Sequence, residues 1–224
     1  MEIRWLGHAA FALTDGDVTV LIDPFLTGNP SAAATADELA ADAILLTHGH
    51  ADHIGDAVAI AKRTGATVQA ITEIAGELGE EGVSAIDTNI GGTAEYPWGS
   101  CRIVQAFHTS TTPQGTVTPA GGLVIEFGGK RIYVLGDTGL FSDIALPSKR
   151  GKIDIAIMPI GGHYTMDRYD AVVAADLAKA DIVIPCHYNT FPPIETDVQG
   201  FKADVEQAGF AQVVVLEPGE SYTP

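Results

Sequence analysis

Short runs rich in hydrophobic residues follow one another at the start of the chain, separated by turn residues, a pattern typical of strands. We expect strands at Ile3–Leu6, Ala9–Leu13 and Val18–Ile22, and Asp15-Gly16 supplies the turn between the second and the third. An apolar run at Asp42–Leu46 predicts another strand. The chain therefore begins as a β-sheet.

Helical spacing follows this first sheet. The segment from Thr35 to Glu38 has the form of a capping box and predicts a short helix. A second helix is expected from Gly55 to Thr64, where Gly65 ends it, and a third at Ile71–Leu78. Between these two helices, Thr67–Ala70 is predicted to be a strand.

The middle of the chain is rich in β-structure, and the end alternates strand and helix. Strands are expected near Arg102–Phe107 and Leu123–Phe127, and Gly128-Gly129 turns the second into Arg131–Leu135. Strands and helices then alternate over Ile153–Met158, Tyr169–Ala178, Ile182–Pro185, Val198–Gln207 and Gln212–Leu216. No linker or repeat interrupts this order, so we expect one domain over residues 1–224, in which sheets pack together with helices outside.

Composition and charge indicate where the protein works and which partners it does not bind. With 224 residues, 46% of them hydrophobic, the chain can bury a core without a disulfide. Two cysteines in no framework pattern and an N-terminus without a signal peptide favour a cytoplasmic protein. No window reaches the ~20 apolar residues that cross a bilayer, so no membrane association is expected. The formal charge of −17 disfavours nucleic acid as a partner, and the longest basic run is Lys149-Arg150-x-Lys152.

Three of the seven histidines crowd into His48-x-His50-x-Asp52-His53. Such crowding suits neither a core nor a plain surface loop, because each buried imidazole needs a hydrogen-bond partner. This spacing cannot place all four side chains on one helix face. A loop turning at Gly49 can instead direct His48 and His50 to one metal ion, and Asp52 and His53 to a second.

Other candidate ligands also follow predicted strands. His108, Asp137 and His187 each come directly after a strand, as the histidine cluster does. Rigid strands that end at one edge of a sheet provide a preorganised set of ligands. We therefore expect these side chains to meet at one edge.

This order of motifs resembles the five-motif pattern of the metallo-β-lactamase superfamily, with Asp23 in Leu21-Ile22-Asp23-Pro24 as the remaining motif. The segments from Gly136 to Asp143 and from Gly161 to Met166 resemble compact, single-domain metal-dependent hydrolases related to the ascorbate-6-phosphate lactonases. The resemblance implies an α/β fold, a four-layer αβ/βα sandwich with the site at its upper edge. It does not imply β-lactam cleavage.

The resemblance also implies a ligand set. His48, His50 and His108 would hold one ion, Asp52, His53 and His187 would hold the other, and Asp137 would bridge both. Two divalent ions are expected, zinc first, with manganese, iron and nickel left open. Asp23 would orient a ligand imidazole or a loop amide. On local sequence alone, Asp23 could equally start a turn before Pro24.

We interpret this constellation as a metal-dependent hydrolase. A hydroxide bridging the metals would attack a small, anionic ester, lactone or phosphodiester. Asp52 and His163 are the residues expected to act in catalysis. His163, beside Tyr164, would contact the substrate or donate a proton to the leaving group, the alternative being a loop histidine. His8 either hydrogen-bonds across the site to a residue that holds the metal or is a structural turn histidine.

Other classes and assemblies stay open. The same scaffold with iron could serve an oxidoreductase of dioxygenase type, and a non-catalytic metal-binding protein is the third class. Members of the compact branch are often homo-oligomers, and the net charge does not forbid such an assembly.

Overall fold

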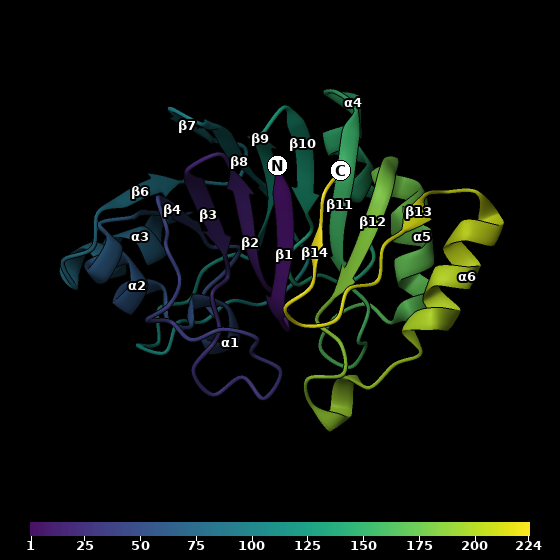
Figure 1. Ribbon diagram of the computed structural model, residues 1–224, viewed down its shortest axis with the longest axis horizontal. Helices are drawn as coiled ribbons and strands as arrows, with labels where there is room; N and C mark the ends of the chain where they lie inside the picture. Colours follow the sequence, from purple (N-terminus) through teal and green to yellow (C-terminus); the bar gives the residue numbers. More distant parts are fainter.

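Two seven-stranded β-sheets face each other in the computed structural model, which describes residues 1–224 (Figure 1). The first sheet contains, in spatial order, β14 (Ser221–Tyr222), β1 (Glu2–Gly7), β2 (Ala10–Asp15), β3 (Val18–Ile22), β4 (Ala43–Leu45), β5 (Thr67–Ile71) and β6 (Ala85–Thr88). The second contains β13 (Gln212–Val213), β12 (Ala180–Cys186), β11 (Ile153–Pro159), β10 (Lys130–Val134), β9 (Gly121–Phe127), β8 (Gly99–Gln105) and β7 (Thr93–Tyr96).

Both sheets are mixed. In the first sheet β14, β1, β2 and β3 are antiparallel neighbours, and β3 to β6 run parallel. In the second sheet β7 to β10 are antiparallel, and β10 to β13 run parallel. The parallel strands need crossover connections, and most of the helices lie in these connections.

Helices cover the outer face of each sheet (Figure 1). The first sheet carries α2 (Ala57–Thr64) and α3 (Thr72–Glu80), and the second carries α5 (Arg168–Ala178) and α6 (Val198–Ala208). Asp167 begins α5 by accepting hydrogen bonds from two backbone N–H groups, and Asp197 begins α6 in the same way with one. Shorter turns complete the chain: α1 (Ala51–Ile54), η1 (Ser142–Ala145), α4 (Leu146–Lys149) and η2 (Pro192–Ile194).

The predicted α/β fold, a four-layer αβ/βα sandwich, is confirmed by this arrangement. One cluster of 60 buried hydrophobic residues fills the layers. β11 is buried along almost its whole length, because the first sheet covers one of its faces and α5 the other. No helix combines the length and the hydrophobicity that a membrane crossing requires.

One helix predicted from the sequence is wrong. The backbone N–H of Thr35 donates to Glu38 as in a capping box, with a distance of 3.1 Å, but no helix follows. Instead, the guanidinium of Arg63 donates to the carbonyl oxygens of Ala36 and Leu39, so a side chain satisfies groups that a helix would otherwise pair. The expected strand Gln212–Leu216 is also shorter, because only Gln212 and Val213 pair with β12.

The two sheets are tied together at the edge where the candidate ligands lie. The N–H of Gly121 on β9 donates to the carbonyl of Thr47 after β4, and the N–H of His187 after β12 donates to the carbonyl of His8, each at 3.0 Å. Gly136 permits the close approach, because its φ is 65° and a Cβ would lie 2.5 Å from the carbonyl oxygen of Gly121. These contacts fix the position of the loops that follow the strands.

Candidate metal centre

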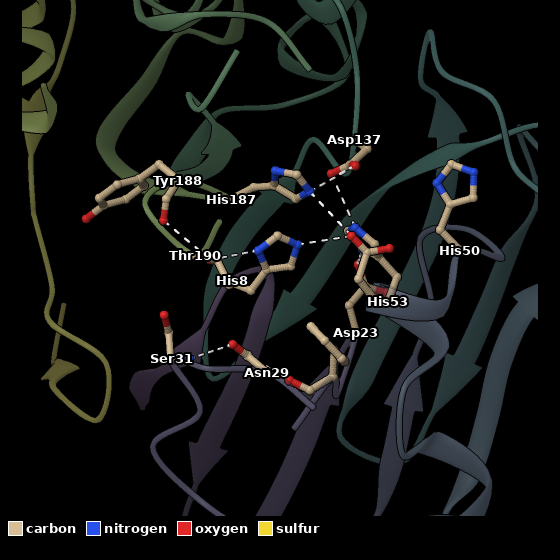
Figure 2. Close-up of polar contacts among 12 residues, drawn as sticks. His8, Asp23, Asn29, Ser31, His50, His53, Asp137, His187, Tyr188 and Thr190 are labelled. Carbon is tan, nitrogen blue, oxygen red and sulfur yellow. Dashed lines mark hydrogen bonds and ion pairs between the residues drawn. The ribbon is translucent and has the colours of Figure 1, made fainter. Parts of the chain in front are cut away.

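The seven side chains predicted as metal ligands lie together at one edge of the sandwich. His48 and His50 follow β4, Asp52 and His53 lie on the single helical turn α1, and the others follow β8, β10 and β12. Sequence analysis expected a loop where α1 forms; the helical turn places Asp52 and His53 on the side of the second group. Figure 2 shows His53, His187 and Asp137 converging, with His50 to one side.

The ligand atoms form two groups that share no residue, and a third group, His48 with His53 and Asp137, joins them. The ligand atoms of His48, His50 and His108 lie within 4.8 Å of one another, and those of Asp52, His53 and His187 do so together with His8. Ligand atoms gathered this closely can surround a cation, and within the groups Nε2 of His48 lies 3.0 Å from Nδ1 of His50 and Nε2 of His8 lies 3.2 Å from Asp52. Each group is therefore sufficient to hold one ion.

Asp137 lies between the two groups. Its Oδ1 is 3.4 Å from Nε2 of His53, and its Oδ2 is 3.1 Å from Nε2 of His187 and 3.6 Å from Nε2 of His108. Its side chain is buried, so it faces these imidazoles and little else. One carboxylate thus reaches a member of each group.

Buried nitrogen atoms without hydrogen bonds show that this donor set fits a metal. Nε2 of His53 and both ring nitrogens of His187 are buried and lack a hydrogen-bond partner. The contacts of the two Nε2 atoms with Asp137 are close enough for ion pairs but lack the alignment of hydrogen bonds. A buried polar atom without a partner is costly, and coordination of a cation satisfies it.

Asp23 and Thr47 fix the orientation of two ligand imidazoles. Asp23 accepts hydrogen bonds from the backbone N–H of Thr47 at 2.9 Å, from its hydroxyl at 2.6 Å and from Nδ1 of His53 at 2.8 Å. Because the Thr47 hydroxyl donates to Asp23, it accepts from Nδ1 of His48, at 3.0 Å. Both imidazoles therefore carry a proton on Nδ1 and turn Nε2 toward the cluster, where Nε2 of His48 lies 3.0 Å from Nδ1 of His50 and would exchange that contact for a metal.

The charge states in the cluster also suit metal binding. Burial lowers the pKa of His53, but Asp137 and Asp23 outweigh it and hold that pKa well above its usual value. Burial raises the pKa of Asp137, yet His187 and His53 hold it well below its usual value. Burial holds the pKa of His48 well below its usual value, and His53 adds to this effect. A charged carboxylate and a neutral imidazole are the forms that bind divalent cations, so loading would release the proton from His53.

His8 lies behind the second group. Its Nε2 is 3.2 Å from Oδ2 of Asp52, its Nδ1 is 2.9 Å from Oγ1 of Thr190, and its ring packs against His187 with 4.0 Å between centroids (Figure 2). Burial lowers the pKa of His8 to about 4, although the hydrogen bond to Asp52 raises it. His8 is thus neutral at pH 7, and it positions the carboxylate of Asp52.

His163 lies at the rim of this centre, in a cavity of about 630 Å³ that His108 also lines. It is exposed on the loop between β11 and α5 and contacts the ring of Tyr164 edge to face. Tyr164 lines this cavity and two others, of about 390 and 270 Å³, that open onto the predicted ligands. The structure therefore brings Tyr164, more than His163, to the mouth of the centre.

Four of these residues adopt a left-handed backbone conformation. The φ angles of His8, Asp23, His163 and His187 are 56°, 42°, 57° and 53°. Such conformations are strained for residues other than glycine and concentrate at functional sites. His8, Asp23 and His187 directly follow β1, β3 and β12, and His163 lies four residues after the end of β11. In each case the chain changes direction at this residue.

Sequence analysis missed several residues that shape the site. Thr47 and Thr190 hold ligand or neighbouring imidazoles, and Phe25, Phe191 and Pro193 line the cavity of about 390 Å³ beside His187. Thr47 adjoins the histidine cluster, but its partner Asp23 lies 24 residues earlier. Thr190, Phe25, Phe191 and Pro193 lie in no sequence pattern that would have indicated a role in the site.

Comparison with known proteins gives consistent matches along the chain. Residues 2–187 match the model of a beta-lactamase superfamily domain. The chain is 48% identical over 226 residues to a UPF0173 metal-dependent hydrolase of Symbiobacterium thermophilum, covering 100% of both proteins. A UPF0173 metal-dependent hydrolase of Thermus thermophilus is 46% identical over 221 residues, which cover 98% of this chain and 97% of that one. Among solved structures, Igni18, a metallo hydrolase from Ignicoccus hospitalis, is 39% identical with a TM-score of 0.90 and covers 99% of this chain and 97% of its own.

Proposed function

Because the chain belongs to the metallo-β-lactamase superfamily, and within it to the UPF0173 metal-dependent hydrolases, we propose that it cleaves a small ester, lactone or phosphodiester at a centre of two divalent ions. One observation carries this proposal: two groups of ligand atoms, each within 4.8 Å, with the Asp137 carboxylate between them. A single structural ion would need only one such group.

The two groups of ligand atoms assign the predicted ligands to the two ions. His48, His50 and His108 would hold one ion, and Asp52, His53 and His187 would hold the other, with Asp137 able to reach both. Zinc suits this set of imidazoles and carboxylates, and manganese, iron or nickel would also be accepted by it. Bound divalent cations supply a Lewis acid and lower the pKa of a water molecule, which makes hydrolysis feasible at neutral pH.

Asp52 combines two roles. Burial raises the pKa of Asp52, but the hydrogen bond from His8 and the nearby His53 hold it well below its usual value, so the group is a carboxylate at neutral pH. Its side chain is 35% exposed and lines the cavity of about 270 Å³. As a carboxylate, Asp52 can accept a hydrogen bond from an attacking water molecule and orient it, while His8 keeps the carboxylate in position; its lowered pKa makes it a weak proton acceptor.

The walls of the site suggest how a substrate lies in it. No Lys or Arg lines the three cavities that adjoin the centre. The negative charge of an anionic substrate would therefore be met by the ions, at the reacting group. Its apolar part would lie against Phe25, Phe191 and Pro193, with Tyr164 at the entrance.

Replacing Asp23 by Ala is expected to weaken metal binding by about 10- to 100-fold and to destabilise the fold by about 3 kcal/mol. The substitution leaves Nδ1 of the buried His53 and the Thr47 hydroxyl without their acceptor. Metal titration and chemical denaturation measure the two effects. Asp56→Ala is the matched control, because Asp56 accepts backbone hydrogen bonds from Leu26 and Thr27 but contacts no histidine. Equal loss of metal affinity in both variants would contradict the orienting role.

Replacing His163 by Ala is expected to lower kcat by about 100-fold, the contribution of a proton donor, while the metal content stays unchanged. The side chain contacts no predicted ligand, so metal analysis separates catalysis from metal loss. Steady-state kinetics of the metal-loaded variant, with Thr165→Ala as the neighbouring control, make the measurement. An unchanged kcat would leave His163 as a loop histidine.

The overall proposal is tested by metal analysis followed by a hydrolysis screen. Protein purified without added metal or chelator should contain about two divalent ions per chain. Lactones, thioesters, carboxylic esters and phosphodiesters are then tested with that metal. About one iron per chain with no hydrolysis of any class would favour an oxidoreductase instead.

A further inference from the structure

Four of the twelve Lys and Arg residues of the chain line one cavity outside the metal centre. The cavity has a volume of about 420 Å³, and the four cations are Arg102, Arg131, Lys149 and Arg150. None of its lining residues is a predicted metal ligand. In a chain of formal charge −17, this is an unusual concentration of positive charge.

Strand register builds the floor of this basic cavity. Arg102 on β8 pairs with Val124 on β9, and Val124 pairs with Tyr133 on β10, so the three side chains form a row on one face of the second sheet. Arg131 lies two residues before Tyr133 and shares its face. The segment from Asp143 to Arg150, which includes α4, forms the opposite wall with Leu146 and Pro147.

The positive charges are only partly balanced. Asp143 is the one acidic residue among the thirteen that line the cavity, against four cations. Nε of Arg131 lies 3.1 Å from Oε1 of Glu126, which does not line the cavity. The guanidinium of Arg131 also packs against Gly151, where any larger residue would collide with it. Burial lowers the pKa of Arg102, and the nearby Arg150 and Arg131 lower it further. Arg102 therefore lies near two like charges, in a cavity whose lining has one carboxylate for four cations.

An anion would relieve this repulsion, and its chemistry follows from the walls. Guanidinium forks match phosphate oxygens in pairs. Val104, Val124 and Leu146 supply an apolar surface next to them. The volume is within the range of small-molecule sites. We propose that this cavity is a second ligand site, which binds a small organic phosphate with its phosphate on Arg102, Arg131 and Arg150 and its apolar body against the valines and Leu146.

Calorimetric titration of the metal-loaded protein with adenosine 5′-monophosphate and, separately, with inorganic phosphate tests this proposal. We expect the nucleotide to bind, phosphate alone to bind more weakly, and Arg102→Gln with Arg150→Gln together to weaken nucleotide binding about tenfold or more. Lys62→Gln, which removes an exposed charge on α2, should leave the affinity unchanged. Circular dichroism confirms that each variant is folded.

Three results would overturn the proposal. One is the absence of nucleotide binding at millimolar concentration. Another is binding that survives the double Arg substitution but is lost in Asp137→Ala, since the phosphate would then lie on the metal ions. The third is an equal loss of affinity in Lys62→Gln, which would indicate a general charge effect. A site of this kind does not depend on the function proposed for the metal centre.

Discussion

Asp137→Ala is expected to reduce the metal content from about two ions per chain to one or fewer and to lower kcat/KM by about a thousandfold or more. Asp137 is the carboxylate that reaches members of both histidine groups, at 3.1 Å from His187 and 3.6 Å from His108. Without it, neither ion keeps its full set of ligands. Elemental analysis and steady-state kinetics on the same preparation measure the two effects.

A second variant separates this loss from unfolding. Asp137 is buried, and removing it leaves the charge of His53 without one of its two carboxylates. Asp137→Asn keeps the volume and one oxygen but removes the negative charge, so it should stay folded and still lose most activity. Full turnover with two ions bound in either variant would contradict the shared role of Asp137.

Removal of metal is expected to lower the melting temperature by about 15 °C or more. Two ions bound at a thousandfold excess over their dissociation constants stabilise a fold by roughly 4 kcal/mol each. In a chain of this size, each kilocalorie shifts the melting temperature by about 2–4 °C. The buried, unpaired Nε2 atoms of His53 and His187 are the groups that lose their partner.

Scanning calorimetry before and after chelation, and again after metal is added back, measures this shift. The Asp137→Ala variant serves as the control, since chelation should change its melting temperature much less. If chelation removes all metal and the melting temperature does not move, the cluster is a stable histidine network that does not require an ion.

Much of the secondary structure could be predicted from the sequence, because its signals are local. The apolar run at Val18–Ile22 lies within the strand that it predicts, and Gly65 directly follows the helix that it ends. Short elements without such a signal were missed, among them β14, whose two residues form a strand only because β1 lies beside them. The helix expected after Thr35 failed because Arg63, distant in sequence, binds its carbonyl groups. The single domain over residues 1–224 stays a prediction.

The sequence by itself determined which chemistry is available, since the crowding of His48, His50, Asp52 and His53 is a local fact of spacing. The resemblance to the superfamily assigned His108, Asp137 and His187 to the two ions. Only the tertiary structure decided how these side chains are held, because Asp23 and Thr47 are 24 residues apart and meet through the pairing of parallel strands. The basic cavity is a second example, because Arg102 and Arg131 share it through strand register and Arg150 through a separate loop. Contacts between distant segments depend on packing, and no local pattern encodes them.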